Sequence, residues 1–196
     1  MRVTLKLRVR RLERDDLALR VSWFNHPDVY RYMTLDVPMS LAATERWFQS
    51  ASVDEKRRDF AFDLWSEQEI RPVAMGGLID INWHHSRAEL YMLVSPQHFG
   101  RKIGRQVLRW MCNYGFSALG LQRIYLTTVE DNRRAQKLYR SHGFQEEGRL
   151  RKHLYHLGKY KDRIIFGLLR DEWEQATWAA VSRSVELEID FEESIS

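Results

Sequence analysis

The sequence predicts a mixed α/β fold, in which one mostly antiparallel sheet contains one parallel strand pair and carries helices on both faces. Three observations lead to this prediction. Apolar residues alternate with period two in several stretches, which is typical of strands. The run at 88–94 is apolar at nearly every position, which is typical of a strand covered on both faces. A helix pattern links that run to the stretch at 123–129, and such a strand–helix–strand step should be a right-handed parallel crossover.

The amino-terminal half is predicted to form one strand, three helical segments and three further strands. Aliphatic residues alternate with cations at the start of the chain, which indicates the first strand. Asp15 and Asp16 favour a helix start, Pro27 opens a short helical piece, and Ser40 caps a third helix. The three further strands are expected around 60–64, 73–83 and 88–94.

The carboxyl-terminal half is predicted to continue with helix, strand, helix and two strands. Apolar residues recur at helical spacing from Ile103 to Ala118. The stretch 123–129 follows as a strand, and 132–142 follows as a helix that Gly143 ends. The closing segment is expected to form two strands that turn at Leu157-Gly158.

Composition indicates one compact domain, which we place at residues 1–183. The chain has 196 residues, 44% of them hydrophobic, and a net charge of +4. Neither a membrane-spanning run nor the apolar core of a signal peptide is evident, so we expect a cytoplasmic protein without a membrane partner. Cys112 is the only cysteine, which excludes disulfides within the chain. The arginines are scattered, which favours a small anionic ligand over nucleic acid.

Residues 184–196 differ from the rest of the chain in composition. Val185, Leu187, Ile189 and Phe191 alternate with acidic residues. Acidic runs are usually solvated tails, whereas strict alternation is typical of a strand. We therefore expect either an acidic tail or an extra edge strand, on this domain or on a second copy.

The stretch HFGRKIGRQV at 98–107 is a candidate anion site. It follows the buried strand and opens a helix, and a helix start presents unpaired N–H groups with partial positive charge. Gly100 and Gly104 let the backbone approach a ligand closely, and three cations stand in the same stretch. The alternative is an ordinary helix start with solvated cations, which two glycines alone do not exclude.

Together with DNRRAQKLYRSHGF at 131–144, this loop resembles the GCN5-related N-acetyltransferases, in particular the branch of ribosomal-protein alanine, spermidine and amino-sugar N-acetyltransferases. In that family a glycine loop after a buried strand receives the acyl-CoA diphosphate. The next helix carries an N-x-x-A-x-x-x-Y pattern followed by GF, which corresponds here to Asn132, Ala135, Tyr139, Gly143 and Phe144. The resemblance implies acetyl-CoA as the cofactor and a parallel strand pair that splays apart.

One position departs from the family loop, which usually reads Q/R/W-x-x-G-x-G/A. Lys102 replaces the middle glycine, and we expect it to adopt a helix-like conformation and still offer its N–H. The residues that the resemblance implies for cofactor binding are Met92, Leu93, Val94, Phe99, Gly100, Arg101, Lys102, Ile103, Gly104, Arg105, Asn132 and Ala135.

Tyr139 and Glu89 are the predicted catalytic residues. Tyr139 lies seven residues, about two turns, after Asn132, so both face the same side of one helix. By resemblance, Tyr139 lies beside the thioester sulfur and protonates the departing thiolate; a role as a core aromatic is the alternative. Glu89 stands in an apolar strand, where desolvation would raise its pKa and suit it to deprotonate an amine. An outward ion pair with Arg87 is the alternative for Glu89.

The amine is expected to attack directly, without an acyl-enzyme. A backbone N–H near Leu93 or Val94 would polarise the thioester carbonyl. Cys112 is expected to be a small buried hydrophobe rather than a nucleophile. The histidine pairs at 84–85 and 153–156 lack carboxylate or cysteine company at metal spacing, so we expect no metal.

The acceptor is expected to be a small amine. WFNHPDVYRYM at 23–33 resembles the opening of the same branch, where the first helices cover the acceptor site. Together with INWHHSRAELYMLV at 81–94 it is similar to enzymes that acetylate a nucleotide-linked amino sugar. A polyamine would need a carboxylate-lined pocket, and the first stretch offers only Asp28. The predicted acceptor-binding residues are Trp23, Asn25, His26, Tyr30, Met33, Trp83 and His85.

Two other functions stay open at this point. One is acetylation of the amino terminus of a protein such as a ribosomal one. The other is a non-catalytic acyl-CoA-binding module. The sequence also leaves open whether the chain forms a homodimer.

Overall fold

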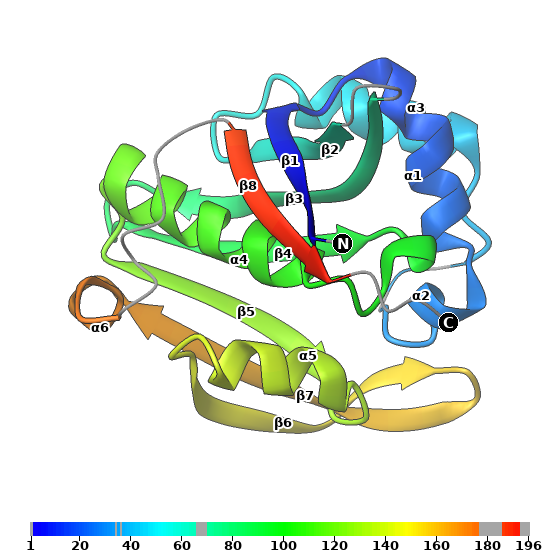
Figure 1. Cartoon of the computed structure of the whole chain (residues 1–196). Coiled ribbons are helices and arrows are strands. Elements are labelled where there is room, and N and C mark those ends of the chain that lie inside the picture. Colours follow the sequence, from blue (N-terminus) through cyan, green and yellow to red (C-terminus); the bar gives the residue numbers. More distant parts are fainter. Residues whose placement is uncertain (1, 34, 36, 66–69, 177–185, 193–196) are drawn as a thin grey trace.

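The chain folds around a single twisted sheet, seen in a computed structural model that describes residues 2–33, 35, 37–65, 70–176 and 186–192 (Figure 1). The sheet has eight strands in the order β6-β7-β5-β4-β3-β2-β1-β8. The strands are β1 (Arg2–Arg11), β2 (Arg58–Trp65), β3 (Ile70–Asn82), β4 (Arg87–Val94), β5 (Arg123–Val129), β6 (Gln145–His156), β7 (Lys159–Leu169) and β8 (Glu186–Glu192). All neighbours are antiparallel except β4 and β5, which are parallel. The predicted fold class is confirmed.

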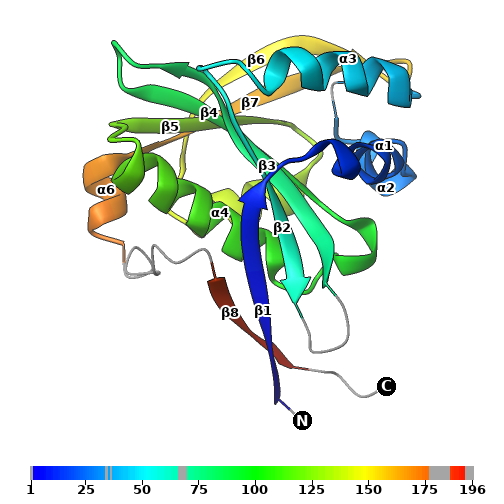
Figure 2. The same cartoon turned by 90° about the horizontal axis from the view of Figure 1, so that it is seen from above.

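Helices cover both faces of the sheet, as predicted (Figure 2). The first group follows β1 and lies on one face, and α4 packs on the other. The first group comprises α1 (Leu17–Phe24), α2 (Pro27–Tyr30) and α3 (Leu41–Ala51); the others are α4 (Ile103–Asn113), α5 (Arg133–Arg140) and α6 (Arg170–Glu174). A π-helical turn at Tyr114–Ala118 extends α4. No helix in the described ranges is long and apolar enough to cross a membrane.

Strand β4 takes part in two cores because its side chains alternate between the faces of the sheet. Ala88 and Leu90 pack with α4 and α5 residues such as Val107 and Tyr139. Leu93 packs instead with the core under α1 to α3, which includes Trp23. One face of β4 is therefore directed toward α4 and α5, and the other toward the first helices.

The two closing strands form the predicted hairpin. Leu157 and Gly158 both have positive φ, 51° and 76°, which is the requirement of a type I′ two-residue turn. The segment Glu186–Glu192, for which the sequence left a tail or an edge strand open, runs as β8 antiparallel to β1. The remaining residues of 184–196 lie outside the described part of the chain. The short helix α6 was not predicted from the sequence.

Candidate active site

A gap opens between β4 and β5 in the middle of the sheet. The parallel pairing joins Arg87, Ala88 and Glu89 to Arg123, Ile124 and Tyr125, and it ends there. Strand β4 continues to Val94, and β5 continues to Val129. After Tyr125, β5 pairs only with β7 among the described strands. The two parallel strands thus diverge after Glu89, as the family resemblance implied.

The register of β4 shows which backbone groups face this gap. Ser95 donates its N–H to the Val73 carbonyl at 2.8 Å, and facing residues of an antiparallel pair alternate between bonded and non-bonded. Leu93 therefore directs its N–H toward β3, whereas Met92 and Val94 direct theirs toward the gap. Of the two carbonyl-polarising donors left open by the sequence, Val94 fits this direction and Leu93 does not.

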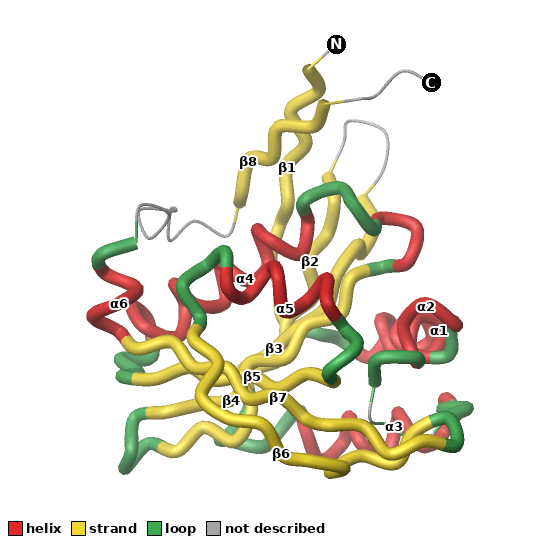
Figure 3. Tube along the Cα trace, turned by 90° about the horizontal axis from the view of Figure 1, so that it is seen from below, coloured by secondary structure: helices red, strands yellow, loops and turns green. Residues whose placement is uncertain are grey.

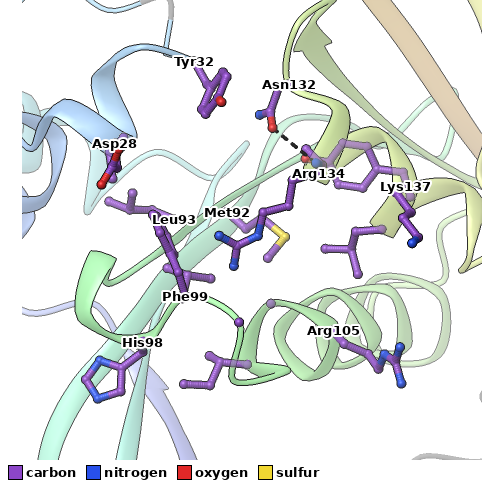
Figure 4. A pocket seen from close by; sticks show the side chains of 18 of the residues that line it. Asp28, Tyr32, Met92, Leu93, His98, Phe99, Arg105, Asn132, Arg134 and Lys137 are labelled. Carbon is purple, nitrogen blue, oxygen red and sulfur yellow. Dashed lines mark hydrogen bonds between the residues drawn. The ribbon is translucent and has the colours of Figure 1, made fainter.

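A cavity of about 580 Å³ lies at this end of β4, between the start of α4, the α5 helix and the α2 region (Figure 4). The cavity contains all the predicted cofactor-binding residues except Arg101, which is exposed outside it. It also contains Tyr139 and Met33. Its lining residues absent from the predictions are Asp28, Val29, Tyr32, His98, Arg134, Lys137, Leu138 and Ser141.

The loop before α4 presents three backbone N–H groups to this cavity. The N–H groups of Lys102, Ile103 and Gly104 have no acceptor among the described residues. Lys102 has φ 59° and ψ 2°, so it is left-handed, and our expectation of a helix-like conformation was wrong. The reason is geometric: the chain turns sharply from the loop into the helix, and Gly100 before it also has positive φ, 83°.

Gly104 lies close to β4 where the helix passes over that strand. A Cβ at this position would lie 3.3 Å from the Met92 side chain and 3.6 Å from that of Val94. The missing side chain keeps the cavity open between the first turn of α4 and β4.

Positive charge surrounds the cavity. Lys102 and Arg105 come from the α4 loop, and Arg134 and Lys137 come from α5, against a single lining carboxylate, Asp28. The Arg134 guanidinium lies 4.4 Å from the centre of the Phe99 ring across the opening (Figure 4). Sequence reasoning missed the α5 cations, although their spacing of three residues places them on one side of that helix. The arrangement suits an anionic ligand.

His98 adds a neutral polar group to the wall of this cavity. Its side chain is buried, and its Nδ1 atom has no hydrogen-bond partner in the described part of the chain. Burial, followed by the charges of Arg71 and Arg101, lowers its pKa. The ring therefore stays uncharged.

Tyr139 lines the cavity from the second turn of α5. Its ring packs on Phe144 and Phe166, with centroids 6.1 Å and 5.7 Å away. Burial raises the pKa of Tyr139 to about 12, so the phenol stays protonated at physiological pH. Asn132 caps the same helix by accepting a hydrogen bond from the Ala135 N–H at 3.2 Å.

Glu89 is the last β4 residue paired with β5, at the base of the gap, but it does not line the cavity. Like Leu93, it stands on the face of β4 toward the first helices. The Thr127 hydroxyl donates to Glu89 Oε1 at 3.3 Å. Burial, with a smaller contribution from the Asp80 charge, raises the pKa of Glu89, while the Thr127 hydrogen bond and Arg163 oppose the rise. No ion pair joins Glu89 to Arg87 in the described residues.

Six of the seven predicted acceptor-binding residues lie outside the cavity, and four of these six come from the first helices. Trp23 is buried in the core under the first helices. Asn25 ties two segments together by donating to the Met39 carbonyl and accepting from the Met39 N–H. His26 caps α2 by accepting from the Asp28 N–H. Tyr32 lines the cavity, and Tyr30 does not.

A second cavity, of about 550 Å³, lies at the opposite end of β4. Trp83 lines it together with Asp80 and Tyr125, and its charges are mixed because Lys56 and Arg87 also line it. Tyr125 is the β5 partner of Glu89, which places this cavity close to Glu89; burial, followed by the charges of Glu89 and Asp80, raises the pKa of Tyr125. His85 lies in the adjacent turn, exposed and in contact with His84, and does not line it. Trp83 and Met33 are thus separated by the length of β4.

Comparison with known proteins agrees with this geometry. The acetyltransferase (GNAT) domain model matches residues 6–145. Spermidine N(1)-acetyltransferase of Escherichia coli K12 is 27% identical over 167 residues, which cover 85% of this chain and 88% of the relative. The Vibrio cholerae enzyme of the same name is 29% identical over 157 residues, which cover 80% and 89%.

A crystal structure of Vibrio cholerae spermidine N-acetyltransferase in complex with CoA and spermine superposes with a TM-score of 0.79. The two chains are 28% identical, and the match covers 85% of this chain and 96% of that one. The GNAT domain model matches well over half of the 196 residues of the present chain. This chain therefore belongs to the GNAT acetyltransferases and is an N-acetyltransferase acting on amines.

Proposed function

We propose that the chain transfers an acetyl group from acetyl-CoA to a primary amine of a polyamine such as spermidine. One observation carries the donor half of the proposal. A cationic cavity with three free N–H groups opens beside the gap in the sheet, and a buried phenol stands in its wall. The acceptor half is supported by the resemblance to spermidine acetyltransferases over most of the chain.

The residues present fit acetyl-CoA. The N–H groups of Lys102, Ile103 and Gly104 would hold its diphosphate, because a helix start favours negative charge. Arg105, Arg134 and Lys137 would add charge and hydrogen bonds around it. The free backbone groups of β4 at Val94 would pair with the pantetheine amides like an added strand. Acetyl-CoA supplies the activated acetyl group.

Three groups of the chain would then carry the transfer. Glu89 takes a proton from the amine through bound water, because it stands at the base of the gap and does not line the cavity, and the amine nitrogen forms the new bond to the acetyl carbon. The Met92 N–H, which also faces the gap, donates a hydrogen bond to the carbonyl oxygen, on which negative charge develops; Val94 lies against Gly104 at the diphosphate end and is too far from the acetyl group. Tyr139 donates to the sulfur as the carbon–sulfur bond breaks. Because a phenol with a pKa of about 12 is a weaker acid than a thiol at about 8.5, hydrogen bonding rather than full proton transfer suffices.

The acceptor would approach from the face of the sheet opposite α4 and α5. Glu89 stands on that face, and its pKa depends on the charge of Asp80 in the second cavity. Two nearby carboxylates can receive two ammonium groups of one chain, a reactive one at Glu89 and a distal one at Asp80. A polyamine needs carboxylates around it, and the stretch 23–33 offers only Asp28. The carboxylates of Asp80 on β3 and Glu89 on β4 meet this need. An amino sugar has no support from the comparisons and is not proposed.

The test is release of CoA thiol from acetyl-CoA over a panel of acceptors. The panel holds spermidine, spermine, a matched alkyl monoamine, a nucleotide-linked amino sugar and a peptide with a free amino terminus. We expect turnover on the polyamines and a higher KM for the monoamine. Turnover on the peptide alone would favour a protein modifier. Binding of CoA without turnover on any amine would favour a non-catalytic module.

The variant Asp80→Asn tests whether Asp80 binds the distal ammonium group of the acceptor. We expect this variant to raise KM for spermidine about tenfold, in line with loss of one charge-assisted contact, and to leave KM for the monoamine unchanged. Equal changes for both acceptors would contradict the placement of the distal ammonium at Asp80.

A further inference from the structure

Strand β5 lies between β4 and β7 in the sheet (Figure 3), and one of its threonines faces the same side of the sheet as Glu89. Leu90 of β4 and Leu126 of β5 are both buried in the core on the side of α4 and α5. Because side chains alternate along a strand, Glu89 and Thr127 point to the opposite face. Thr127 is thus the first β5 residue on this face beyond Tyr125, where the pairing with β4 ends.

The Thr127 side chain spans the base of the gap between the two strands. Its hydroxyl donates to Glu89 Oε1 at 3.3 Å, and no other described side chain forms a hydrogen bond with this carboxylate. Glu89 Oε2 is therefore left to accept a proton. A distance of 3.3 Å is long for an O–H···O bond, so the bond is weak in the free enzyme, and catalytic hydrogen bonds often tighten when the substrate binds.

The charges near Glu89 act on it without direct contact. Burial has the largest effect and raises the pKa of Glu89; the Thr127 hydrogen bond and the charge of Arg163 on β7 lower it, and the charge of Asp80 on β3 raises it. No ion pair joins Arg163 to Glu89 in the described residues. Tyr125, the β5 partner of Glu89, is a phenol whose own pKa is raised, so it stays neutral. Among these groups, Thr127 alone holds the carboxylate in place.

A threonine suits this position because its side chain is branched at Cβ and has few rotamers, which keeps the hydroxyl in a fixed direction. A valine would keep the same shape and lose the donor. The next residue, Thr128, is buried on the opposite face of the strand and does not contact Glu89. The two adjacent threonines therefore allow a hydroxyl bonded to Glu89 to be compared with one that is only buried.

We propose that Thr127 is the positioning residue of the base: its hydroxyl holds Glu89 Oε1 on the β5 side of the gap and leaves Oε2 to take the proton of the amine through bound water. This role rests on the proposed function, in which Glu89 is the base. Thr127 keeps its own proton and forms no bond to the substrate. It fixes the direction of the carboxylate and stabilises the ionised form, which is the active one.

The variant Thr127→Val tests this role by removing only the hydroxyl. The pKa of Glu89 should rise by about half a pH unit, because a weak hydrogen bond to the charged form changes that equilibrium about threefold. Carbon-13 NMR of the Glu89 carboxyl group, assigned by its loss in Glu89→Gln, measures this rise in the folded chain without substrate. In steady-state kinetics, kcat/KM on the low-pH limb should fall about threefold, while the dissociation constant of CoA stays within about twofold.

Two further variants separate positioning from a merely structural role. Thr127→Ser keeps the hydroxyl and should return both the pKa of Glu89 and the low-pH limb to those of the unmodified chain. Thr128→Val makes the same change on the opposite face and should leave both unchanged. A fall in kcat/KM that is equal at every pH in Thr127→Val, and that serine does not reverse, would overturn the proposal.

Glu89→Gln distinguishes failure of the Thr127 role from failure of the base itself. A low-pH limb that persists in Glu89→Gln would remove Glu89 as the base and overturn the proposal with it. A limb that is lost in Glu89→Gln but stays at the pH of the unmodified chain in Thr127→Val would overturn the role of Thr127 alone.

Discussion

At the scale of single residues, Tyr139 is the first test of the chemistry. Tyr139→Phe keeps the ring between Phe144 and Phe166 and removes only the hydroxyl. We expect kcat to fall about 100-fold, within the range for loss of a general acid, while the dissociation constant of CoA stays within about twofold. Steady-state kinetics and calorimetry measure the two quantities. Unchanged turnover would leave Tyr139 only its packing role.

The raised pKa of Glu89 predicts how kcat/KM depends on pH. Its active form is the carboxylate, and burial raises its pKa, so the kcat/KM of the unmodified enzyme should rise with pH through a value above that of an ordinary carboxyl group. Glu89→Gln should abolish this low-pH limb. Because the Asp80 charge also raises the pKa of Glu89, Asp80→Asn should move the limb to lower pH. An intact limb in Glu89→Gln would exclude Glu89 as the base.

Lys102 stores backbone strain at the cofactor loop. A non-glycine residue in the left-handed region costs about 1 kcal/mol, which glycine avoids. Lys102→Gly should therefore melt about 2–4 °C above Lys102→Ala, which lacks the same charge but keeps the strain. Equal melting temperatures of the two variants, measured by calorimetry, would show that the loop relaxes without glycine.

At the scale of elements, helix α5 carries cations that line the cavity and cations that do not, and the two kinds should differ in their effect on CoA binding. Arg134 lines the cavity, whereas its neighbour Arg133 is exposed and does not. Arg134→Gln should weaken CoA binding about tenfold, equivalent to about 1.4 kcal/mol, and Arg133→Gln should change it less than about twofold. Titration calorimetry of both variants checks this difference. An equal loss in the two would mean that α5 acts only through its net charge.

The elements themselves were predictable because their signals are local. Alternation in β2, the cap at Ser40 and the turn at Leu157-Gly158 each depend on a few neighbouring residues. The direction in which a helix side chain points depends on tertiary packing and not on neighbouring residues alone. Trp23, Asn25 and His26 match a family opening, but packing turns the first into the core and the other two toward the backbone. Arg134 escaped prediction because its role depends on α5 lying opposite Phe99.

At the scale of the whole molecule, the order of strands explains why distant residues meet. The parallel step places Glu89 beside Tyr125, and the divergence that follows opens the sheet between α4 and α5. The sequence predicts that parallel step, and the family resemblance implies the divergence. Neither indicates that Asp80, the carboxylate that we propose for the acceptor, lies near Glu89, because that depends on how β3 and β4 pair.

The proposed function depends on binding of the diphosphate of an acyl-CoA by the start of α4 and the adjacent α5 cations. Calorimetric titration of the folded chain with CoA measures this binding. We expect saturable binding of one CoA per chain, weaker at high salt because the contacts are ionic. Absence of binding by folded protein at millimolar CoA, on the order of the weakest affinity relevant to a cofactor, would contradict it.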